Sequence, residues 1–104
     1  MNGQTEIDAP VIGFPKFFTP NNDTYNDTWK VIGAHSIYFK SVAVTIFDRF
    51  GKILVILDLN SNSFGWDGIY SGKTMPKSDY WFSAALVDKK GKTRIRRGHF
   101  SLLR

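Results

Sequence analysis

The chain has 104 residues, of which 42% are hydrophobic and 15% aromatic, and it carries a formal net charge of +5. This composition excludes a disordered tail, and the length fits one domain with its own core. Cysteine is absent, which excludes a disulfide framework and a thiolate metal site. The sequence has no apolar run long enough to cross a bilayer and no signal-peptide pattern, so we expect no membrane insertion.

The chain begins with a polar stretch, MNGQTEIDAP, that ends in a proline. We expect residues 1–10 to be a linker, in which Met1 is a start codon added to a piece of a longer protein. Residues 11–104 would then form the domain. Within it, we expect a short strand at residues 11–14 and a second strand at residues 28–32.

Residues 14–29 (FPKFFTPNNDTYNDTW) are the stretch richest in turn-forming and aromatic side chains. Prolines fix φ, and asparagine and aspartate side chains form hydrogen bonds with nearby backbone amides. Aromatic residues stand on both sides of the polar ones. We therefore expect a loop with a defined shape rather than a slack connection.

Residues 42–50 are the clearest strand, because their side chains alternate and both faces are largely apolar. This pattern predicts a central strand in a structure of two layers. A hairpin at residues 48–52 leads into another strand at residues 53–59, and Gly51 supplies the positive φ that such a turn needs.

The second half of the chain also shows alternating strands joined by a hairpin. Trp66 and Tyr70 are expected to close one end of the core. Residues 80–88 alternate regularly, and a charged hairpin connects them to a last strand at residues 93–103.

The last strand contains a change of parity. Ile95 is at an odd position, whereas Phe100 and Leu102 are at even ones, and a regular strand would point the two groups to opposite faces. An extra residue near Gly98 would restore one apolar face. We therefore expect a β-bulge there, with Phe100 and Leu102 in the core.

Nowhere does a helical pattern compete with these runs of period two. The sequence predicts an all-β fold, an Ig-like antiparallel β-sandwich of about seven strands in a single domain.

The polar loop raises the question of a metal. Asn21, Asp23, the carbonyl of Tyr25 and Asp27 alternate as the early ligands of a calcium loop do. However, Ile32 stands where an EF-hand needs an acidic ligand. Two alternatives remain: no cofactor, with these side chains capping turns, or a weak calcium site at Asn21, Asp23 and Asp27.

Basic residues are concentrated near the end of the chain, at Lys89, Lys90, Lys92, Arg94, Arg96, Arg97 and Arg104. Such a run can bind nucleic acid, but edge strands also use charge to prevent aggregation. We favour the protected edge and expect no nucleic-acid partner. An acidic partner on a membrane protein or cell surface is the intermediate alternative.

Catalysis is not expected. The only histidines are His35 and His99, and no nucleophile elbow or metalloprotease motif occurs. Trp29, Trp66 and Trp81 suit either a sugar-stacking platform or positions in the core.

The string Phe-Thr-Pro-Asn-x-Asp-x-x-Asn-Asp-x-Trp, read from Phe18 to Trp29, resembles the opening signature of a bacterial family. This family is the gliding motility-associated C-terminal domain, or type B sorting domain of the type IX secretion system of Bacteroidota. Later motifs agree in order and spacing, at residues 46–52 (IFDRFGK), 66–68 (WDG), 71–73 (SGK) and 98–104 (GHFSLLR). The resemblance covers roughly nine-tenths of the chain.

The resemblance implies a C-terminal sorting domain that directs a large secreted or surface protein, such as an adhesin or gliding-associated protein, through the type IX system. It would be recognised as a folded domain by the secretion machinery, through an outer-membrane protein of the PorP/SprF type. Its cargo would pass the periplasm and outer membrane and be secreted or held at the cell surface.

By the same resemblance, two sets of residues are candidates for recognition. The signature loop would serve recognition or the fold, through Pro20, Asn21, Asp23, Asn26, Asp27 and Trp29. The closing strand would be a docking strand, through Arg94, Arg96, Arg97 and Arg104.

The alternative hypothesis is a calcium- or glycan-binding adhesion module of a surface protein. A sorting domain must lie at the extreme C-terminus of its parent, which the closing Arg104 favours, whereas a binding module can lie anywhere.

Overall fold

The computed structural model describes residues 12–21, 27–34, 38–58 and 65–103. In this part of the chain there are seven β-strands and no helix. The strands are β1 (Phe17–Phe18), β2 (Phe39–Phe47), β3 (Ile53–Asp58), β4 (Ile69–Tyr70), β5 (Lys73–Thr74), β6 (Ser78–Asp88) and β7 (Thr93–Leu102). The prediction of an all-β, sandwich-like single domain is confirmed.

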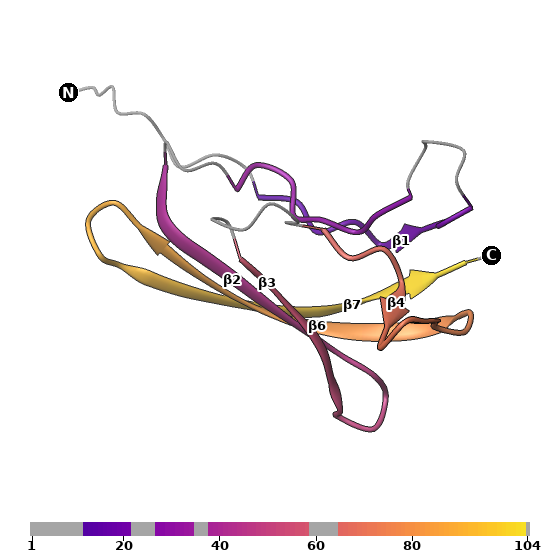
Figure 1. The fold of residues 1–104 in the computed structure, drawn as a ribbon. Helices are drawn as coiled ribbons and strands as arrows, with labels where there is room; N and C mark the ends of the chain where they lie inside the picture. The colour runs from indigo at the N-terminus through magenta and orange to yellow at the C-terminus, as the bar shows by residue number, and fades with distance from the viewer. Residues whose placement is uncertain (1–11, 22–26, 35–37, 59–64, 104) are drawn as a thin grey trace.

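The larger of the two sheets has five strands in the order β1-β7-β6-β2-β3, and β4 and β5 form a separate hairpin. Neighbours in the large sheet are antiparallel except β1 and β7, which are parallel. Figure 1 shows the sheet as a curved layer, with β1 at its edge beside the end of β7 and residues 27–34 in a second layer above it.

The second layer contains less regular structure than the sequence predicts. Where we expected strands at residues 11–14 and 28–32, the described residues form only isolated bridges, Gly13 with Ile32 and Trp29 with Trp66. Pro15 and Pro20 lack the amide hydrogen that a ladder needs, and they flank the two-residue β1. Backbone hydrogen bonds from β7 to residues 16–18 and side-chain contacts such as Trp29 on Phe100 hold these residues to the sheet.

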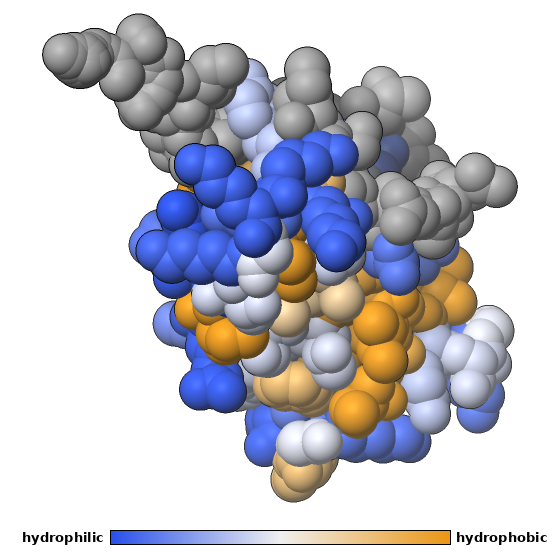
Figure 2. Space-filling model, turned by 90° about the vertical axis from the view of Figure 1, so that its left-hand side faces the viewer, coloured by the Kyte–Doolittle hydropathy of each residue, from blue (hydrophilic) through white to orange (hydrophobic). Residues whose placement is uncertain are grey.

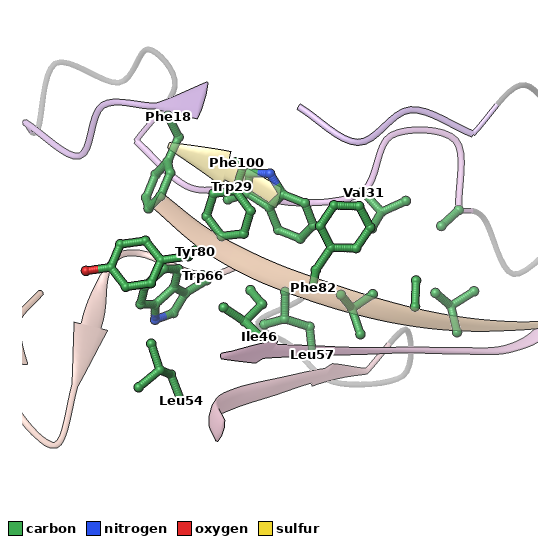
Figure 3. Close-up of a cluster of buried hydrophobic side chains, with 14 of the residues drawn as sticks. Phe18, Trp29, Val31, Ile46, Leu54, Leu57, Trp66, Tyr80, Phe82 and Phe100 are labelled. Carbon is green, nitrogen blue, oxygen red and sulfur yellow. The ribbon is translucent and has the colours of Figure 1, made fainter. Parts of the chain in front are cut away.

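The core lies between the two layers and is strongly aromatic (Figure 3). The alternation predicted for residues 80–88 is confirmed, because Tyr80, Phe82, Ala84 and Leu86 of β6 are buried. Trp66 is only 2% exposed, so its predicted place at the end of the core is confirmed as well. The other buried side chains on the large sheet include Phe39, Val42, Val44, Ile46, Leu54, Leu57, Phe100 and Leu102.

Two hairpins with the same turn geometry and hydrogen bonds set the register of the sheet. In each, an aspartate side chain, Asp48 or Asp88, accepts hydrogen bonds from backbone amides two and four residues later. The turn glycines Gly51 and Gly91 have φ of 84° and 90°, a conformation that residues with a Cβ rarely adopt.

The predicted bulge near Gly98 is wrong. The register between β6 and β7 runs without a break from Ser78↔Leu102 to Val87↔Thr93. Ile95 therefore lies on the outer face of the sheet, 47% exposed. Gly98 faces inward opposite Phe82, and a Cβ there would lie 2.9 Å from two carbons of the Phe82 ring. The glycine makes room for this ring and does not bend the strand.

Candidate recognition surfaces

The first part of the signature segment and the last strand are joined at one end of the sheet. The amide of Ser101 donates to the carbonyl of Lys16 at 2.9 Å, and the amide of Leu103 donates to the carbonyl of Phe18 at 3.0 Å. These bonds place β1 parallel to the end of β7, with Phe17 opposite Ser101. Motifs more than eighty residues apart thus form one structural unit.

A glycine of the WDG motif packs into the same unit. A Cβ on Gly68 would lie 3.1 Å from Leu102 and 3.5 Å from both Phe18 and Pro20. The φ of Gly68 is 84°, so a larger residue would be both strained and crowded. The sequence pattern contains no signal of this packing role.

The side chain at the centre of this unit is Phe100 (Figure 3). Trp29 stacks on it with ring centroids 4.5 Å apart, while Trp66 meets it edge-on at 6.1 Å. The backbones of the two tryptophans also exchange a pair of 2.8 Å hydrogen bonds. The motifs therefore converge on one aromatic cluster.

The indole nitrogens of these tryptophans are directed at backbone carbonyls. Trp29 Nε1 donates to Pro15 at 2.8 Å, and Trp66 Nε1 donates to Ile69 at 3.1 Å. Trp29 is 0% exposed, so it belongs to the core and has no surface to offer a partner. Of the two roles expected for the signature loop, Trp29 fills the structural one.

The polar residues of the signature loop are only partly placed. Pro20 is partly buried and Asn21 is exposed, and the amide of Asn21 donates to Asp27 Oδ1 at 3.1 Å. Asp23 and Asn26 lie outside the described residues. Among the residues that the structure describes, no group of three histidines or carboxylates is arranged to hold a metal ion. Of the expected calcium ligands, the structure describes only Asn21 and Asp27, and a hydrogen bond joins these two residues.

The basic residues of the closing strand do not share one face. Because β7 is regular, Arg94 and Arg96 lie on the same side as Phe100, whereas Arg97 lies on the outer side with Ile95. The candidate docking residues Arg94, Arg96 and Arg97 therefore do not form one outward-facing row, and Arg104 lies outside the described residues.

On this inner side Arg94 is partly buried and Arg96 is exposed, although their partners on β6, Leu86 and Ala84, are buried. Arg94 and Arg96 line a small pocket of about 140 Å³ together with Ile12, Phe39 and Leu86. A pocket with an apolar floor and cationic walls suits an apolar group beside a carboxylate.

Asp88, in the turn that leads into this strand, accepts hydrogen bonds from two backbone amides of the turn. The pKa of Asp88 is held below its ordinary value, first by the hydrogen bond from the Lys92 amide. The Lys90 amide and the charges of Arg94 and Lys92 act in the same direction, while desolvation opposes them.

The outer face of the sheet offers no platform of three tryptophans. Trp29 and Trp66 are buried, and only Trp81 is exposed, at 37%, with its ring 6.3 Å from that of His99. The sugar platform considered for these residues is therefore not formed.

Figure 2 shows that hydrophilic side chains gather on one part of the surface, beside a hydrophobic band.

The described strands and loops include no helix that is long and apolar enough to pass through a lipid bilayer. No curated protein matches the chain. The family model CHU_C, described as a type IX secretion signal domain, matches residues 12–102 and so spans the signature segment, the aromatic cluster and β7. The chain therefore belongs to the type IX secretion signal domains, which are sorting signals on proteins that cross the outer membrane to be secreted or displayed on the cell surface.

Proposed function

We propose that the secretion machinery reads this domain as a folded unit, and that an outer-membrane protein of the PorP/SprF type makes the direct contact. The domain itself performs no reaction. Its function is to carry a surface that the machinery binds, while the cargo is linked covalently to it.

The observation that supports this proposal most strongly is the pairing of β1 with the end of β7. Residues from both ends of the family match meet there, around Phe18, Gly68 and Leu102. A surface built from such distant segments exists only after folding. An unfolded chain would present the same motifs separately, so a linear signal is a poorer explanation of their arrangement.

Two surfaces of the domain are available for contact. One is the exposed part of the signature loop near Asn21, and the other is the basic half of β7 with Arg94, Arg96 and Arg97. We favour the basic half, because long-range attraction between charges speeds the encounter of two proteins.

The test is export of a reporter fused to this domain from cells that have a type IX system. The triple variant Arg94→Gln, Arg96→Gln, Arg97→Gln is compared with the control Lys30→Gln, Lys73→Gln, Lys77→Gln, which removes the same charge from exposed positions elsewhere. Docking through β7 predicts loss of export for the arginine variant alone, with the melting temperature of both variants kept. Equal export by the two folded variants would exclude the basic half of β7 and leave the signature loop as the contact.

A further inference from the structure

In the part of the chain that the structure describes, one edge of β7 lacks a neighbouring strand over most of its length. The amides of Ser101 and Leu103 point toward β1, where they donate to Lys16 and Phe18. Because the strand is regular, the amides and carbonyls of residues 95, 97 and 99 point to this same edge. Yet β1 pairs only with Ser101 and Leu102.

Within the described residues, no hydrogen bond reaches the outward amides of Ile95 and Arg97. Among these residues, the one donor to the carbonyl of Ile95 is the guanidinium of its neighbour, with Arg96 Nη1 at 3.2 Å. Exposed groups like these form a ready template for an added strand.

The edge is open because the segment before β1 turns away from it. Phe14 stacks on Phe82 with ring centroids 4.6 Å apart, and Gly13 pairs with Ile32. These contacts draw the segment over the inner face of the sheet. It therefore does not continue alongside β7.

The charges along the edge indicate what kind of strand would fit. Arg94 and Arg96 stand on one side of β7 and Arg97 on the other, and the strand contains no carboxylate. A second copy of this domain would place arginines against arginines, which is unfavourable. A segment with carboxylates on both of its faces would meet a cation on each side.

The pocket beside Arg94 adds a further preference. A strand added along this edge would direct alternate side chains toward Ile12, Phe39 and Leu86. An apolar side chain among the acidic ones would fill this space of about 140 Å³.

We propose that the edge of β7 at residues 93–99 receives an extended acidic segment of the secretion machinery as an added β-strand. This inference rests on the proposed function, because it assigns the partner's segment and its mode of binding. The backbone hydrogen bonds hold the segment in place, and the arginines select its charge.

The decisive variant is Ile95→Pro, with Ile95→Thr as its matched control. Proline removes the outward amide hydrogen, but it removes no hydrogen bond to β6 and no charge. Threonine is β-branched and keeps the amide. Reporter export by Ile95→Pro should fall about tenfold or more, the factor expected when a backbone hydrogen bond is lost. Ile95→Thr should export normally, and equal export by the two folded variants would overturn the proposal.

A binding experiment tests the same edge without any substitution. The probe is a short synthetic peptide of the sequence Glu-Glu-Val-Glu-Glu, which as a strand presents carboxylates on both faces and one apolar side chain, and its charge-reversed control is Lys-Lys-Val-Lys-Lys. Hydrogen exchange at the amides of Ile95 and Arg97 should be fast in the free domain and slow with the glutamate peptide. The amide of Arg96, which faces β6, should be protected in both cases. No protection by the glutamate peptide, or equal protection by the lysine peptide, would overturn the assignment of an acidic partner.

The two experiments separate this inference from the proposed function. If the unchanged domain does not export the reporter, the proposed function fails, whatever the peptide does. If it does export the reporter but Ile95→Pro exports equally well, only the added strand is rejected.

Discussion

The two halves of β7 have the same backbone geometry but opposite surroundings. In the second half, Phe100 and Leu102 are fully buried, and β1 covers the outer edge. In the first half, Ile95 and Arg96 are exposed and the edge is open. One strand can therefore help to close a core at one end and offer backbone and charge to a partner at the other.

The boundary between the two halves lies at Gly98. There the ring of Phe82 takes the space of a side chain, and it is stacked in turn against Phe14. In the half of β7 that precedes Gly98, the second layer no longer buries the inner face of the strand fully. The difference between the two halves of β7 thus follows from how far the second layer extends over the sheet.

The largest expected effect is in the buried half. Phe100→Ala removes the ring on which Trp29 stacks, and it should lower the free energy of unfolding by about 3–5 kcal/mol. Ile95→Ala, in the exposed half, should cost less than about 1 kcal/mol. Urea denaturation of both variants measures this contrast, and similar losses would show that the two halves are not distinct.

A smaller effect is expected at the boundary. Gly98→Ala places a methyl group 2.9 Å from the Phe82 ring, and the crowding should cost roughly 1–3 kcal/mol. In a background with Phe82→Leu there is more room, so the same substitution should cost less. A double-mutant cycle measures this coupling, and a penalty that does not depend on residue 82 would contradict the packing described.

A pH effect is expected in the turn that opens the exposed half. Because the pKa of Asp88 is lowered in the folded state, its charged form adds stability above the ordinary value of 3.8. That contribution is lost as the pH falls through the lowered pKa of the folded state. The stability difference between the unchanged domain and Asp88→Asn should therefore shrink as the solution is acidified below 3.8. A constant difference across a series of thermal denaturations would contradict this role.

The smallest expected effect concerns the signature loop beside the buried half. With Asp27 accepting a hydrogen bond from the Asn21 amide, we expect side-chain to backbone bonds to hold this loop. A chelator should then leave the melting temperature unchanged, and added calcium should not raise it. A fall of several degrees with chelator would instead show that calcium binds and stabilises the native state.

The strands after residue 38 were largely predictable, because regular alternation and turn residues mark them directly. β2, β3 and β6 lie within a few residues of the expected ranges, and Gly51 has the expected positive φ. The second layer was not predictable, since single bridges and aromatic contacts such as Phe14 on Phe82 leave no periodic pattern.

The candidate site was predictable in its motifs but not in its geometry. The parity change after Ile95 has two physical explanations, a bulge or a strand that leaves the core, and only the structure separates them. Because of the same ambiguity, the sequence alone does not indicate the open edge of β7. If a strictly regular β7 had been assumed, the sequence would have predicted Arg94 and Arg96 on one face of the strand and Arg97 on the other.

The parallel pairing of β1 with the end of β7 also affects the order of events during synthesis. The ribosome must release β7 before β1 can pair with it, so the domain cannot complete its fold until its last strand has been synthesised. Contacts this distant in sequence also slow folding, to about milliseconds or longer. A prematurely terminated copy would lack Phe100 and Leu102 and could not assemble the aromatic cluster. The topology thus makes the export signal a check that translation has reached the end of this domain.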